Sequence, residues 1–149
     1  MPYLALIDHL TNSIKNESGI LITTGYSFND EHINDSILNA LKANPTSMVI
    51  ALLYGELSEY PRAVEIARRR PNISLWAFDK AIIGTKEGIW KPIDDFEKED
   101  NIAEVIVGKE VDNPDKADEK MTSWRLTLGD FSKLGDFLQE LVGYENEEN

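Results

Sequence analysis

The residues best suited to chemistry form one block, Gly25-Tyr26-Ser27-Phe28-Asn29-Asp30-Glu31-His32-Ile33-Asn34. The block follows a short apolar run and leads into a predicted helix, which is where open α/β sheets bind their ligands. Gly25 lets a ligand approach the backbone closely, and free amides at a helix start can hold a phosphate. Asp30 and Glu31 oppose a phosphate but suit sugar hydroxyls. We therefore expect ribose or adenosine near Asp30, rather than pyrophosphate.

A purely structural interpretation of the same residues stays open. Ser27 and Asp30 have a Ser-x-x-acid spacing close to that of a capping box, and acidic residues stabilise the first turn of a helix without any ligand. In this interpretation His32 is a hydrogen-bonded structural residue. The same holds for His9, which lies beside Asp8 in an amphipathic stretch. Spacing alone does not separate the two interpretations.

Other candidate sites have weaker patterns. The two histidines lie far apart without a His-x-x-His spacing, so we expect no metal site. The acidic runs lack the spacing of a calcium loop, and Ser27 lacks the Gly-x-Ser-x-Gly frame of a nucleophile. The remaining groups are interpreted as solvated charges or as core or half-buried strand residues: Asp94–Glu97, Asp112–Asp118, Arg68–Arg70, Trp76, Trp90 and Trp124.

The elements around the block alternate between strand and helix. Apolar runs predict strands over 20–24, 48–54 and 73–78. Between them, helical spacing predicts one helix over 29–43 and another that begins at Pro61 and ends in Arg68–Arg70. Because the strands are uniformly apolar and the links are short, we expect three adjacent parallel strands with crossover helices.

The flanking segments give a three-part organisation. A helix over 3–16 comes first, and two short strands over 81–84 and 88–91 complete a Rossmann-like partial parallel sheet within 1–93. Residues 94–120 are predicted to be an acidic loop or insert, in which 105–107 is a possible strand. Residues 121–149 then supply a strand over 124–128, a closing helix over 130–142 between Asp130 and Gly143, and a frayed tail.

Composition excludes several classes of protein. The chain has 149 residues, enough for one domain, and a net charge of −12. Residues 94–120 alone hold 4 basic and 11 acidic side chains. This charge argues against nucleic acids and anionic membranes as partners. The absence of cysteine excludes disulfides, thiolate metal sites and a cysteine nucleophile, and it suits the cytoplasm. We also expect no transmembrane helix and no signal peptide, because no long apolar run or basic leader is present.

The block Gly25–Asn34 resembles the late motif of bacterial sirtuin-like domains. Gly84–Trp90 and Leu128–Phe131 fit the same family. The resemblance implies an α/β, Rossmann-like domain that binds NAD, with Gly25, Tyr26, Ser27, Asp30 and His32 as cofactor-binding residues. Many proteins of this kind cleave NAD as effectors of anti-phage defence, sometimes with an ATPase partner. The resemblance therefore implies an NAD hydrolase, with NAD as ligand or substrate and no metal.

The chain also departs from the family pattern. Tyr26 stands where classical sirtuins carry threonine, and there are no cysteines for a zinc module, so protein deacetylation is not expected. The family's Gly-Ala-Gly phosphate loop and its catalytic histidine precede the segment seen here, and neither His9 nor His32 has that histidine's context. The chain thus resembles the C-terminal portion of such a protein, and we expect it not to turn over NAD alone. The alternative is a non-catalytic interaction module, and in either case we expect a homo-oligomer or a partner protein.

Overall fold

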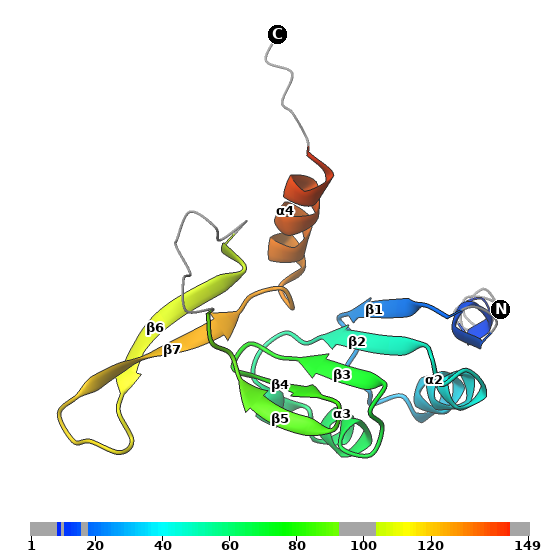
Figure 1. Cartoon of the computed structure of the whole chain (residues 1–149), viewed down its shortest axis with the longest axis horizontal. Coiled ribbons are helices and arrows are strands. Elements are labelled where there is room, and N and C mark those ends of the chain that lie inside the picture. Colours follow the sequence, from blue (N-terminus) through cyan, green and yellow to red (C-terminus); the bar gives the residue numbers. More distant parts are fainter. Residues whose placement is uncertain (1–8, 10, 16–17, 93–103, 144–149) are drawn as a thin grey trace, which may run out of the picture.

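The computed structural model describes residues 9, 11–15, 18–92 and 104–143, and its centre is a five-stranded mixed sheet (Figure 1). The strands lie in the order β1-β2-β3-β4-β5. The first three run parallel and end level with one another, because Thr24 is in register with Leu52, which is in register with Trp76. The three adjacent parallel strands predicted from the sequence are therefore confirmed. Their bounds are Ile20–Thr24 for β1, Met48–Leu52 for β2 and Ile73–Trp76 for β3.

Two crossover helices cover one face of this sheet. They are α2 (Glu31–Ala43) and α3 (Pro61–Ala67), the latter preceded by the short 3₁₀ helix η1 (Leu57–Glu59). Since the strands advance in sequence order, crossovers of one hand place both helices on the same side. The main core lies between these helices and the sheet, with members such as Ile37, Leu41, Val49, Ala63, Ile73 and Leu75. The prediction that α3 continues to Arg70 was wrong, because Arg68 is its C-cap.

A hairpin forms the far edge of the sheet. It consists of β4 (Lys80–Ile83) and β5 (Lys86–Ile89), both antiparallel to their neighbours. Gly84 and Thr85 both have positive φ, +57° and +71°, as a two-residue type I′ hairpin turn requires. The two predicted short strands exist, but the second begins two residues earlier than expected. The sheet is accordingly mixed, and the α/β class with flanking helices is confirmed.

A separate two-stranded ribbon corrects the predicted acidic loop. β6 (Ile106–Asp112) pairs antiparallel with β7 (Lys120–Leu126), so the acidic segment 94–120 contains a seven-residue strand and β7 begins four residues before the expected start at 124. The ribbon joins the sheet where the Leu126 amide donates to the Phe78 carbonyl at 2.9 Å. An ion pair of 2.7 Å between Arg125 and Glu56 lies beside this junction.

The chain ends in the helix α4 (Phe131–Val142), whose predicted limits are confirmed. Asp130 caps its start, and Gly143 ends it at φ +66°. Residues 11–15 are helical and bury Ile14 in the main core, while the rest of the helix predicted over 3–16, the run Asp94–Glu97 and the tail 144–149 lie outside the described residues. Among the helices that the structure describes, none has the length and apolar character needed to cross a membrane.

Candidate functional site

The loop after β1 turns the chain sharply at two residues with left-handed backbone. Gly25 has φ +68°, and a Cβ placed there would meet nothing within 4 Å, so the backbone of this position is open. Phe28 has φ +62° although it is not a glycine, and its side chain is only 1% exposed. Burial of the Phe28 ring against the Tyr26 ring, at a centroid distance of 4.7 Å, offsets the strain of that backbone conformation.

A buried amide holds the loop in this shape. Asn34 is 1% exposed, and its Nδ2 donates to the Phe28 carbonyl at 2.8 Å. The Tyr26 hydroxyl donates to Asn34 Oδ1 and also lies 3.2 Å from the Asp30 carbonyl. The sequence reasoning gave Asn34 no role. The available signal was its spacing, because Asn34, Ile37 and Leu41 lie on one face of α2 and a polar residue on an apolar face demands a partner.

Asp30 is the N-cap of α2. Its Oδ1 accepts hydrogen bonds from the amides of His32 at 3.0 Å and Ile33 at 3.2 Å. The helix begins at Glu31 and not at 29, so the predicted capping box between Ser27 and Asp30 was wrong while the capping role of Asp30 is confirmed. Asp30 is therefore needed to start α2, whether or not it also holds a sugar.

Glu31 does not act as a second uncompensated charge in the first turn. Its carboxylate receives two hydrogen bonds from Arg62 of α3, from Nε at 2.7 Å and from Nη2 at 2.9 Å. These bonds lower the pKa of Glu31 and raise the pKa of Arg62. Arg62 also pairs with Glu65 at 3.0 Å. The sequence could not reveal this pairing, because Glu31 and Arg62 lie 31 positions apart.

The five residues expected to bind a cofactor lie together, since they share one loop and the first turn of α2. Tyr26 and Asp30 are engaged in holding that loop. Ser27 is half-buried, and Gly25 and His32 are exposed. His32 and His9 are both exposed.

The start of α2 offers few free amides to a diphosphate. A diphosphate would need the first free amides of α2, but Asp30 already occupies those of His32 and Ile33. Sugar hydroxyls can instead donate to carboxylate and carbonyl oxygens next to the open Gly25 backbone. One buried group nearby is unsatisfied, because Thr23 Oγ1 finds no hydrogen-bond partner among the described residues. No group of histidine and acidic residues within the described ranges is arranged to hold a metal ion.

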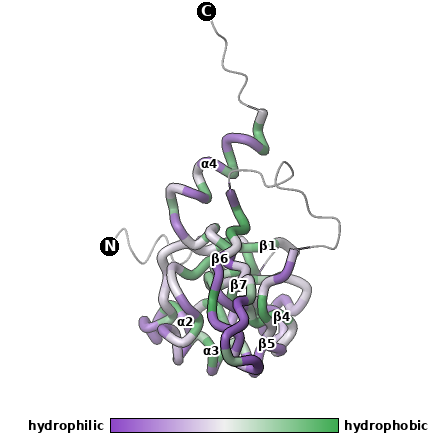
Figure 2. The backbone as a smooth tube through the Cα atoms, turned by 90° about the vertical axis from the view of Figure 1, so that its left-hand side faces the viewer, coloured by the Kyte–Doolittle hydropathy of each residue, from purple (hydrophilic) through white to green (hydrophobic). Residues whose placement is uncertain are grey.

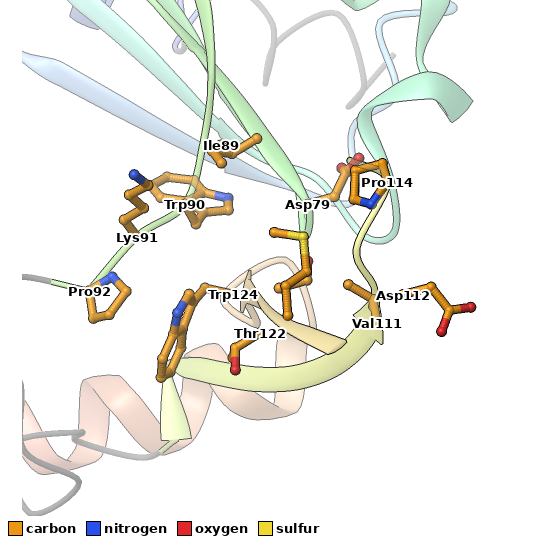
Figure 3. Close-up of a pocket in the computed structure, with 12 residues that line it drawn as sticks. Asp79, Ile89, Trp90, Lys91, Pro92, Val111, Asp112, Pro114, Thr122 and Trp124 are labelled. Atoms are coloured by element: carbon orange, nitrogen blue, oxygen red, sulfur yellow. The ribbon is translucent and has the colours of Figure 1, made fainter. Parts of the chain in front are cut away.

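A hollow lies between the hairpin and the ribbon (Figure 3). Its volume is about 690 Å³, and Trp90 and Trp124 form part of its wall, with Asp79 and Asp112 among the polar residues. Trp90 is fixed there, since its Nε1 donates to the Ala77 carbonyl at 2.8 Å and its ring meets Trp76 edge-on at 5.9 Å. All three tryptophans are half-buried, one of the two predicted outcomes, although Trp90 follows β5 and is not part of a strand. This size and lining are typical of small-molecule pockets, although the sequence gave no sign of it.

Comparisons with known proteins do not assign a family. No protein-family model matches the chain, and no curated protein matches it. The functional argument therefore depends on the residues and their geometry.

Proposed function

We propose that this chain forms one wall of an NAD-binding site, as the C-terminal portion of a sirtuin-like protein whose complete form hydrolyses NAD, as an anti-phage defence effector does. The observation that carries the proposal is the loop 25–30, which has an open backbone at Gly25 and lies at the carboxyl end of a parallel strand. Gly25, Ser27, Asp30 and His32 face the ribose end of the nucleotide in this proposal, and Tyr26 holds the loop in place.

The free edge of β1 supports a larger sheet. Within the described residues β1 pairs only with β2, so one row of its backbone amides and carbonyls has no strand beside it. Proteins normally protect such edges with charges, proline or bulges. Here residues 18–29 contain neither a charged residue nor proline. A further parallel strand beside β1 would satisfy this edge and bring a diphosphate-binding loop next to Gly25.

In the proposed protein, the strands and loops beside β1 bind the diphosphate and supply the group that activates water. NAD cleavage needs a bound diphosphate and a group that activates water, and each of these contributes a large rate factor. We place both in the added strands and assign no catalytic residue to the described part of this chain. Its own contribution is to orient a ribose and to close one side of the site, in the cytoplasm and without a metal.

The alternative function is a non-catalytic interaction module that joins copies of itself or a partner such as an ATPase. The observation that favours it is the set of large apolar side chains left on the surface, which includes Ile20, Ile22, Phe131 and Val142. The two functions differ in whether the loop 25–30 binds NAD.

The test is to incubate the purified chain with NAD, to follow nicotinamide release by chromatography, and to measure retained NAD by equilibrium dialysis. We expect no release above buffer and weak retention, with a dissociation constant of about 1 mM. Release that is lost in Asp30→Ala or His32→Ala would contradict our placement of catalysis outside this chain. Absence of any retained NAD would favour the interaction module.

A further inference from the structure

The hollow beside Trp90 and Trp124 lies apart from the loop 25–30. Its walls come from Asp79, from the end of β5 and from the ribbon, whereas the loop follows β1 at the opposite edge of the sheet. Its volume of about 690 Å³ suits a small organic molecule. A role for this hollow is therefore independent of the proposed function, and the failure of either proposal leaves the other untouched.

Large apolar side chains line the hollow and remain open to solvent. Ile89 is 65% exposed at the end of β5, and Met121 is 40% exposed on β7. Figure 2 shows that much of the ribbon is hydrophilic, yet Val111, Met121 and Trp124 of the ribbon all line this hollow. A ligand with an apolar part would take these side chains out of water, which favours its binding.

Both tryptophans of the hollow are held in place before any ligand binds. The Trp90 ring is fixed by the bond from its Nε1 to the Ala77 carbonyl and by the edge-on contact with Trp76. Trp124 lies opposite Gly108 in the ribbon, and a Cβ on Gly108 would lie 3.3 Å from the Trp124 ring, so this ring packs on the backbone of β6. Fixed rings lose little freedom when a flat ligand covers them, and their faces attract cations.

Asp79 gives the hollow a negative charge. Its Oδ1 accepts a hydrogen bond from the Leu57 amide at 2.9 Å, which fixes the direction of the carboxylate. No lysine or arginine of the described residues pairs with Asp79. The residue is half-buried, and a partly desolvated carboxylate is stabilised by a cation placed beside it.

The other charged residues of the hollow do not supply that cation. Asp112 pairs with Lys120, and the Asp112 side chain is 88% exposed. Figure 3 shows the Asp112 carboxylate pointing away from the other lining residues, and it shows Lys91 on the side of Trp90 away from Asp79. The net charge of −12 on the whole chain favours the approach of cations.

We infer that this hollow binds an aromatic amine, whose protonated nitrogen pairs with Asp79 while its ring covers the apolar wall at Trp90 and Trp124. Each part of such a molecule matches one feature of the hollow: the ring matches the fixed tryptophans, and the positive charge matches the carboxylate and the tryptophan faces. A neutral aromatic molecule would leave Asp79 without a counter-ion, and an aromatic acid would be repelled by it.

Three probes that share one ring test the charge preference: tryptamine, which is a cation at neutral pH, indole-3-ethanol, which is neutral, and indole-3-acetate, which is an anion. Each is titrated into the full isotope-labelled chain, and the indole N–H resonances of Trp90 and Trp124 are followed by NMR. We expect tryptamine to shift both resonances and to bind about tenfold more tightly than the alcohol, with the acetate weakest. Equal affinities for the three probes, or no shift at either tryptophan, would overturn the inference.

Two variants with the same change in net charge locate the preference. Asp79→Asn keeps an oxygen for the Leu57 amide but removes the charge, so it should weaken tryptamine about tenfold and leave the alcohol unchanged. Asp112→Asn is the matched control and should bind tryptamine as the natural chain does. An equal loss in both variants, or an undiminished preference for tryptamine in Asp79→Asn, would overturn the assignment of the amine to Asp79.

A third variant tests the aromatic wall. Trp124→Leu keeps an apolar side chain in β7 but removes the indole ring. It should weaken tryptamine and the alcohol alike, because both probes place the same ring against this wall. Unchanged binding of both probes in Trp124→Leu would show that they bind elsewhere, and it would overturn the site.

Discussion

Asp30 has a structural role as the N-cap of α2 and a proposed functional role as an acceptor for ribose hydroxyls. Its carboxylate caps α2, so removing it must cost stability even if no ligand binds. We expect Asp30→Ala to lower the free energy of unfolding by about 1 kcal/mol, the usual effect of losing an N-cap. Urea denaturation followed by circular dichroism measures this.

Asp30→Asn is the matched control, since asparagine caps helices as well as aspartate does. It should keep the stability while losing the charged acceptor that we propose for ribose hydroxyls. A stability loss in Asp30→Asn as large as that in Asp30→Ala would show that the charge itself, and not the cap geometry, holds this turn.

Glu31 gives the site its pH dependence. The hydrogen bonds from Arg62 hold the pKa of Glu31 below its ordinary value of 4.5. A carboxyl whose pKa is lowered by folding stabilises the protein above its unfolded pKa, and this contribution disappears as the pH falls through the folded value. Glu31→Gln should therefore reduce stability near pH 6 and leave it nearly unchanged near pH 3.

Both partners are exposed, so the effect of Glu31 should be small and should shrink in salt. Urea midpoints of the two proteins from pH 3 to pH 7 measure it. A constant difference between them across this range would show that the ion pair does not contribute.

At the scale of elements, the junction between β2 and α4 is held by a close backbone approach. A Cβ on Gly129 would lie 1.9 Å from the Leu53 carbonyl oxygen, and neither backbone can move freely. Gly129→Ala should therefore cost about 1–3 kcal/mol, as overpacking typically does, and should loosen α4 from the sheet. Thermal unfolding of the variant is the measurement.

Gly135→Ala is the opposite case within the same helix. A Cβ there meets nothing within 4 Å, and alanine favours the helix over glycine by about 0.5–1 kcal/mol. The variant should be more stable than the natural protein. Equal effects at the two glycines would contradict the close approach at Gly129.

The sequence predicted those elements whose side chains are buried in a regular pattern. The bounds of β1 and the start of β2 followed from their β-branched and apolar runs, and Asp130 and Gly143 mark the ends of α4, but β2 ends at Leu52, two residues before the predicted end at 54. The strand β6 was missed for most of its length because Lys109, Glu110 and Asp112 are typical of a solvated loop. Backbone pairing with β7, and not burial, holds that strand, and hydropathy does not detect such pairing.

The candidate site was predicted in position but not in detail. The loop lies where the strand-to-helix pattern placed it. The roles within it depend on contacts across the fold, such as Asn34 with Tyr26 and Arg62 with Glu31, and sequence spacing does not encode these partners. The pocket beside Trp90 brings together two segments that the sequence placed in different parts of the chain.

At the scale of the whole molecule, the sheet is well packed on the face that carries α2 and α3 and only partly covered on the other face. The main core joins the sheet to α2 and α3, and a smaller core joins β2 to the ribbon and α4, while the edge of β1 and the side chains of Ile20 and Ile22 remain uncovered in the described residues. The proposed function assigns the strands of a larger NAD-binding sheet to the edge of β1.

The measurement that tests the central claim most directly is a residue-resolved NMR titration of the isotope-labelled chain with NAD at millimolar concentration. We predict that amide shifts concentrate at residues 24–33, around Gly25 and the start of α2, and that they diminish in Asp30→Asn while its fold is unchanged. Shifts confined to the pocket of Trp90 and Trp124, or no shifts at all, would contradict the claim that this loop is the ribose wall of an NAD site.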